Sequence, residues 1–101
     1  MATVHAKIDM PPDEASTAIR RQAAALGYAL AEGQSAPGLW VFTKGVTLFS
    51  WGSKLTVKVE SEKKNGSHLT VTTDEKFAIS DWGRGKRAAL KLLDPIGARE
   101  V

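Results

Sequence analysis

The sequence predicts an α+β domain in which an antiparallel sheet of about five strands carries two helices on one face. Three observations support this prediction. Apolar and polar residues alternate near the start and in the middle of the chain, a pattern typical of half-buried strands. Two other segments, one after the first strand and one near the C-terminus, repeat apolar residues with helical spacing. Short loops separate most of the expected strands, and strands joined by short loops pair antiparallel.

The chain is expected to begin with a strand and a helix. Residues 3–9 alternate between apolar and polar side chains, so this strand has one buried face. Prolines at 11 and 12 end the strand and suit the first turn of a helix, which should continue to Leu26, before Gly27. The expected buried residues are Val4, Ala6 and Ile8 in the strand and Ala15, Ala18, Ile19, Gln22, Ala23 and Leu26 in the helix, with Ser16, Arg20, Arg21 and Ala24 turned away.

The middle of the chain is expected to form strands. These cover residues 28–32, 39–44, 46–51, 55–61 and 68–73, and a last extended stretch contains Phe77 and Ile79. Gly45 is expected to mark a turn or bulge. Residues 62–67 should form a hairpin loop, because Asn65-Gly66 accepts positive φ. Asp74 and Glu75 are expected to form a turn, since neighbours on a strand point apart.

The C-terminal helix is expected to begin after Asp81, a good N-cap residue, and to end at Asp94-Pro95. Its apolar face is expected to contain Trp82, Ala89, Leu90 and Leu93 with Gly85, and Arg84, Arg87 and Lys91 form a basic face. Residues 97–101 are expected to be a loose tail.

Composition limits the classes of function. A chain of 101 residues fits a single domain covering 1–101. The absence of cysteine excludes disulfides and thiol chemistry and fits a reducing compartment. The N-terminus lacks the apolar core of a signal peptide, and no apolar run is long enough to span a membrane. A net charge of +3 permits nucleic-acid binding without favouring it. We therefore expect a soluble, cytoplasmic protein with no membrane partner.

Two tripeptides, Ser50-Trp51-Gly52 and Asp81-Trp82-Gly83, echo each other. With the basic residues after the second, they resemble the motifs of a family of small bacterial proteins of uncharacterised function. The matching residues are Ser50, Trp51, Gly52, Lys54, Asp81, Trp82, Gly83, Arg84, Lys86 and Arg87, whereas Gly85 departs from the polar residue expected there. The resemblance covers roughly the second half of the chain and implies no reaction. The element order also resembles the fold of the TATA-box-binding protein and of helix-grip proteins, a likeness of fold alone.

The start of the last helix is a candidate anion-binding site. Its residues Gly83, Arg84, Gly85, Lys86 and Arg87 combine backbone N–H groups and three cations at a helix N-terminus. The alternative is structural: Gly85 lets the helix approach the sheet, and the cations are only hydrated on its outer face. Asp81 at the cap would also repel an anion.

Trp40, Phe42 and Phe49 are a candidate interaction surface. If Leu39 and Val41 face the helices, these three aromatic residues point to the other face of the sheet. They would then form a patch for a protein partner, for self-association or for stacking of nucleic-acid bases. Alternatively, Gly45 shifts the register and hides some of them. Trp51 and Trp82 are expected to be core residues, with the wall of a ligand cavity as the alternative.

The sequence predicts no catalytic residue, no cofactor and no metal site. His5 and His68 fall on the outer faces of adjacent strands, but no carboxylate or third ligand is placed with them. The leading function is therefore a non-catalytic binding module for an unknown protein partner or a second copy. The alternative is nucleic-acid or other polyanion binding through Arg84, Lys86, Arg87 and Lys91 with Arg20 and Arg21. The third is a small-molecule or lipid carrier with a pocket between helices and sheet.

Overall fold

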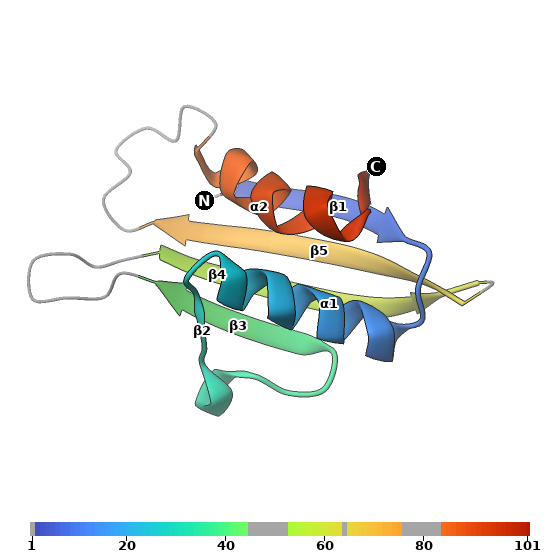
Figure 1. Cartoon of the computed structure of the whole chain (residues 1–101), viewed down its shortest axis with the longest axis horizontal. Coiled ribbons are helices and arrows are strands. Elements are labelled where there is room, and N and C mark those ends of the chain that lie inside the picture. Colours follow the sequence, from blue (N-terminus) through green and yellow to red (C-terminus); the bar gives the residue numbers. More distant parts are fainter. Residues whose placement is uncertain (1, 45–52, 64, 76–83) are drawn as a thin grey trace, which may run out of the picture.

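The computed structural model of the chain describes residues 2–44, 53–63, 65–75 and 84–101. Within these residues, one antiparallel sheet of six strands carries two α-helices on one face (Figure 1). The elements are β1 (Ala2–Ile8), α1 (Pro12–Ala25), β2 (Ala29–Leu30), the 3₁₀ turn η1 (Glu32–Gln34), β3 (Leu39–Lys44), β4 (Ser53–Glu62), β5 (Gly66–Glu75), α2 (Arg84–Leu93), the 3₁₀ turn η2 (Asp94–Ile96) and β6 (Arg99–Glu100). The predicted fold class is confirmed. None of the described helices has the length and apolar character that crossing a membrane requires.

The centre of the sheet is the β4–β5 hairpin. The strand order is β2-β3-β4-β5-β1-β6, and β4 pairs with β5 from Ser53 opposite Glu75 to Glu62 opposite Gly66. Asn65 has the predicted positive φ, 59°, which lets the chain reverse within a few residues. Both strands are longer than predicted, because backbone pairing continues past their last apolar residues. Asp74 and Glu75 therefore lie in β5, and the expectation of a turn there is wrong.

The core lies between the helices and one face of the sheet. Alternate residues of β1, β5 and β4 point towards it, and the register aligns them in rows such as Val4, Val71 and Val57. This confirms the alternation predicted for the three strands. The buried core residues are Val4, Ala6, Ile8, Ala15, Ile19, Ala23, Phe42, Leu55, Val57, Val59, Leu69, Val71, Ala89, Leu92, Leu93 and Ala98. Two alanines of α1, Ala15 and Ala23, are fully buried, so this helix lies close to the sheet, whereas Ala18, which was also expected in the core, is only partly buried.

Strand β3 faces the core with the opposite set of side chains from the one predicted. Phe42 is only 2% exposed and lies opposite Leu55 of β4, in the core. Trp40 points to the same side and packs against the core, whereas Leu39 is 37% exposed. The predicted exposed aromatic patch is therefore wrong for Trp40 and Phe42, and Phe49 lies outside the described residues. The reason is that the two large rings fill the space beneath α1, whereas Val41, which is also buried at 4% exposed, lies on the other face of β3.

A hydrogen bond connects β3 to α1. The indole N–H of Trp40 donates to the hydroxyl oxygen of Ser16 at 2.9 Å. Ser16 is consequently buried on the inner side of α1, although the helical spacing predicted the outer side. The guanidinium of Arg20, one turn later, lies 5.0 Å from the centre of the Trp40 ring. An indole that is buried only in part thus finds a polar partner for its N–H and a cation for its ring.

Both ends of α1 follow the prediction. Pro12 occupies the first turn, and Gly27 has a φ of 91° just after the helix. At this end the ammonium of Lys44, the last residue of β3, donates to the carbonyl oxygen of Leu26 at 2.7 Å. A cation at the carbonyl end of a helix complements its dipole, so this contact fixes the end of α1 to the sheet.

Helix α2 buries a different set of leucines from the one expected. Ala89, Leu92 and Leu93 are buried, whereas Leu90, which the helical spacing places in the core, is only half-buried. The reason is that α2 packs at once on β5, on β1 and beside α1, which widens its buried face towards Leu92. Leu90 is left beside α1, at the surface.

The two edge strands also differ from the prediction. The strand expected over residues 28–32 is reduced to β2, because the chain turns into η1. The C-terminal tail is ordered: β6 pairs with β1, and the backbone N–H of Val101 donates to the carbonyl oxygen of His5 at 2.9 Å. Gly97, with a φ of 83°, turns the chain back towards this edge. Backbone hydrogen bonds hold the tail, and apolar periodicity gives no sign of them.

Candidate functional site

The predicted anion site lies only partly within the described residues. The described helix α2 starts at Arg84, so residues 84–86 form its first turn, and the side chain of Arg87 is exposed. Gly83 lies outside the described residues, as do both Trp-Gly tripeptides with Trp51 and Trp82. Anion binding at the start of α2 therefore stays a prediction.

A surface groove of about 500 Å³ lies between α1 and α2. Its lining residues are Gln22 from α1, Leu26 just after α1, and Arg87, Leu90, Lys91, Asp94 and Pro95 from α2 and η2. The side-chain amide of Gln22 donates to the carbonyl oxygen of Lys91 at 3.3 Å, which fixes the two helices relative to each other. We call this set of residues the α1–α2 groove.

The α1–α2 groove combines apolar and charged side chains. Leu26, Leu90 and Pro95 supply apolar surface, and the exposed cations Arg87 and Lys91 lie beside them on α2. Asp94, the first residue of η2, supplies the groove's carboxylate. Two of the four α2 cations that the sequence assigns to polyanion binding are thus placed next to exposed apolar surface. Of the two assigned on α1, Arg20 contacts Trp40, and Arg21 is exposed.

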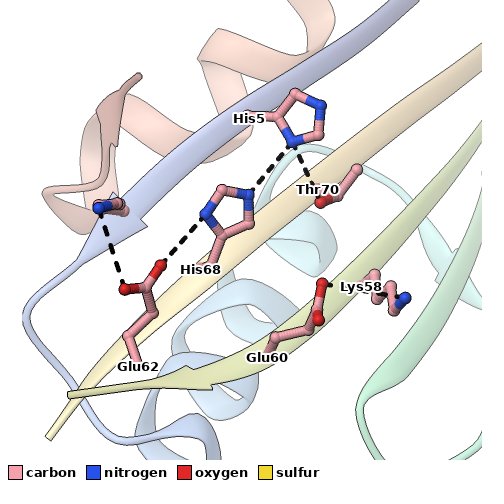
Figure 2. A network of polar contacts seen from close by, with 7 residues as sticks. His5, Lys58, Glu60, Glu62, His68 and Thr70 are labelled. Carbon is pink, nitrogen blue, oxygen red and sulfur yellow. Dashed lines mark hydrogen bonds and ion pairs between the residues drawn. The ribbon is translucent and has the colours of Figure 1, made fainter.

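The opposite face of the sheet, which carries no described helix, holds a polar network from three strands (Figure 2). His5 Nδ1 lies 3.2 Å from His68 Nε2 and 3.4 Å from the hydroxyl of Thr70. On the other side of the His68 ring, Nδ1 lies 3.4 Å from Glu62 Oε1. The second oxygen of Glu62 lies 3.9 Å from the ammonium of Lys7. We call these five residues the histidine network.

Sequence reasoning placed both histidines correctly on the outer face but missed Glu62, which it assigned to the hairpin loop. The extended β4–β5 register keeps Glu62 in the strand and on the face that carries His68. The Asn65-Gly66 pair favours a short turn, and a short turn would have kept Glu62 in the preceding strand. Among the described residues, no group of three or more metal-ligating side chains is arranged around one point.

The space between the helices and the sheet is occupied by side chains of the core. The buried apolar residues of both helices and of the inner strands form one contacting cluster. The described core therefore gives no support to a carrier with a pocket in that layer. The chain matches no protein-family model, and comparisons with curated proteins and with solved structures also give no match.

Proposed function

We propose that the chain is a non-catalytic, cytoplasmic binding module whose α1–α2 groove takes an acidic amphipathic helix of a partner protein. The observation that carries this proposal is the juxtaposition of apolar and basic side chains in the groove. Leu26 and Leu90 offer apolar contact, and Arg87 and Lys91 lie beside them. A groove with apolar surface and a few charged groups is the usual form of a site that recognises an amphipathic helix.

The partial exposure of Leu90 is the second observation that supports a partner at the groove. It is a large apolar side chain on a helix whose neighbouring leucines, Leu92 and Leu93, are fully buried, yet it stays half-buried beside α1. Apolar surface of this kind next to charged groups is typical of a protein–protein contact. Anchoring side chains of a partner helix, spaced at i, i+4 and i+7, would cover Leu90 and Leu26.

Charge defines the chemistry of the partner. Arg87 and Lys91 are one turn apart on α2, so two carboxylates one turn apart on a bound helix would meet both cations. Asp94 at the end of the groove disfavours a further acidic residue there. The partner helix therefore carries its carboxylates opposite α2 rather than opposite η2.

Nucleic acid is the competing partner for the same cations. Phosphate groups would pair with Arg87 and Lys91 but would leave Leu26, Leu90 and Pro95 uncovered. The net charge of +3 is also low for a surface that binds nucleic acid by charge alone. We therefore favour the protein partner and use a nucleic-acid duplex as the second probe.

Leu90→Gln is expected to weaken binding of a synthetic acidic amphipathic peptide by about tenfold or more, the loss typical of an interface anchor. The double variant Arg87→Ala/Lys91→Ala should weaken it as well, because both charge contacts are lost. Fluorescence anisotropy with a labelled peptide of leucines at i, i+4 and i+7 and glutamates between them measures both effects. Lys58→Ala, which removes one exposed cation from the opposite face of the sheet, is the matched control and should leave the affinity unchanged.

Salt and a duplex distinguish the two partners. Peptide binding should keep most of its affinity between low and moderate salt, because the apolar contacts are not screened. Binding of a DNA duplex should fall steeply over the same range. The proposal is wrong if Leu90→Gln binds the peptide like the parent, or if only the duplex binds.

A further inference from the structure

We propose that His5 and His68 form a binding site for a divalent ion of the Cu²⁺, Ni²⁺ or Zn²⁺ type on the face of the sheet opposite the helices. The ligand atoms are His5 Nδ1 and His68 Nε2, which lie 3.2 Å apart (Figure 2). Two imidazole nitrogens bound to one tetrahedral ion at about 2.0–2.1 Å are about 3.3 Å from each other. The spacing that an ion requires is therefore present, and only the rings need to turn.

The backbone fixes this spacing. His5 lies opposite Thr70, and Lys7 lies opposite His68, so the two histidines are diagonal neighbours on the paired strands β1 and β5. Their ring centroids are 5.4 Å apart. Because β1 is paired on both sides, with β5 and with β6, the distance between the two Cα atoms cannot change without breaking the ladder. The site is thus prepared in advance by the sheet.

Glu62 selects the form of His68 that binds a metal. Glu62 Oε1 lies 3.4 Å from His68 Nδ1 and favours a proton on that nitrogen, which leaves the lone pair on Nε2 directed towards His5. Without an ion this lone pair accepts an N–H from His5 Nδ1, 3.2 Å away. A carboxylate behind a histidine is the usual second contact of a metal-ligating imidazole, since it fixes the tautomer and the orientation of the ring. Lys7 in turn contacts the other oxygen of Glu62. His5, whose side chain is exposed, carries its proton on Nε2 in water when Nδ1 binds the ion.

The donor set defines the class of ion. Imidazole nitrogen suits Cu²⁺, Ni²⁺ and Zn²⁺, whereas Mg²⁺ and Ca²⁺ require oxygen ligands. The described residues supply no third ligand at this position. The nearby Glu60, which lies opposite His68, is instead 3.9 Å from the ammonium of Lys58. Water completes the coordination, and the affinity should follow the general order in which Cu²⁺ binds most tightly.

Calorimetric titration of the intact chain with Cu²⁺, Ni²⁺ and Zn²⁺ salts tests the proposal. We expect one ion per chain, with no binding of Mg²⁺ or Ca²⁺, and the imidazole ¹⁵N signals of both histidines should shift with Zn²⁺. Glu62→Gln should weaken binding by about tenfold, the usual effect of losing the carboxylate behind a ligand. His68→Ala should weaken it further, because a ligand itself is lost. All these variants should melt like the parent, because their side chains lie on the solvent side of the sheet.

Glu60→Gln is the matched control. It removes the same charge from the same strand and the same face, but Glu60 contacts Lys58 and not a histidine. Its affinity should stay close to that of the parent. If His68→Ala binds as the parent does, or if none of the three ions binds, the site does not exist. If Glu60→Gln and Glu62→Gln lose affinity equally, the role of Glu62 as the carboxylate that orients His68 is wrong. Because the α1–α2 groove lies on the other side of the molecule, the peptide and metal experiments fail independently.

Discussion

Phe42→Ala is expected to lower the free energy of unfolding by about 3–5 kcal/mol, because it leaves a ring-sized cavity in the core. Phe42 is among the largest fully buried side chains and is 2% exposed. It lies opposite Leu55 on one side and Leu30 on the other, so neither neighbour can move far to fill the space. Urea denaturation followed by circular dichroism measures the change, and the melting temperature should fall by more than about 10 °C.

Leu39→Ala is the control on the same strand. Leu39 is 37% exposed and belongs to the other face of β3, so its truncation should cost about 1 kcal/mol or less. The two variants together test which side chains of β3 face the helices. An equal loss in both variants, or a larger loss for Leu39→Ala, would contradict the orientation of β3 described above.

Leu92→Ala is expected to cost about 2–5 kcal/mol, the range for a buried leucine truncated to alanine. Leu92 is fully buried in the cluster that connects α2 to the sheet. Leu90→Ala, two residues earlier, should cost clearly less, because Leu90 is half-buried at the α1–α2 groove. Both variants have the same chemistry and lie in the same helix, so helix propensity cancels in the comparison.

The two leucines distinguish two rotations of α2. The helical stripe read from the sequence places Leu90 inside, and the packing of α2 beside α1 places Leu92 inside. Chemical denaturation of both variants gives the ranking. A larger loss for Leu90→Ala would support the first rotation, and it would also remove the basis of the groove, since Leu90 would then be a core residue.

The groove and the histidine network lie on opposite sides of the sheet and differ in chemistry. Leu90, Arg87 and Lys91 belong to the helices, whereas His5 and His68 belong to the strands. Substitutions in one set should therefore leave the other unaffected, since distant sites with no shared partners are usually additive. A double variant such as Leu90→Gln/His68→Ala provides the check.

The local sequence alone determined the elements whose pattern of apolar, proline and glycine residues allows a single interpretation. Strands β1, β4 and β5 alternate strictly, so the buried set, for example Val57 and Val71, follows from a period of two. Pro12 and Gly27 bound α1 for reasons of backbone geometry that no tertiary contact alters. Asn65 turns the hairpin for the same kind of reason. These features required only the preferences of neighbouring residues.

Tertiary structure decided the elements whose pattern is ambiguous or long-range. Strand β3 is apolar on both faces, so only the space beneath α1 could select Phe42 over Leu39 for the core. The position of α1 likewise decides that Leu92 and not Leu90 is buried in the core. The approach of Glu62 to His68, and of the tail to His5, depends on strand register, which joins residues far apart in the chain. The sequence shows which residues are apolar and how they are spaced, but only the packing of the elements determines which of two apolar faces is buried.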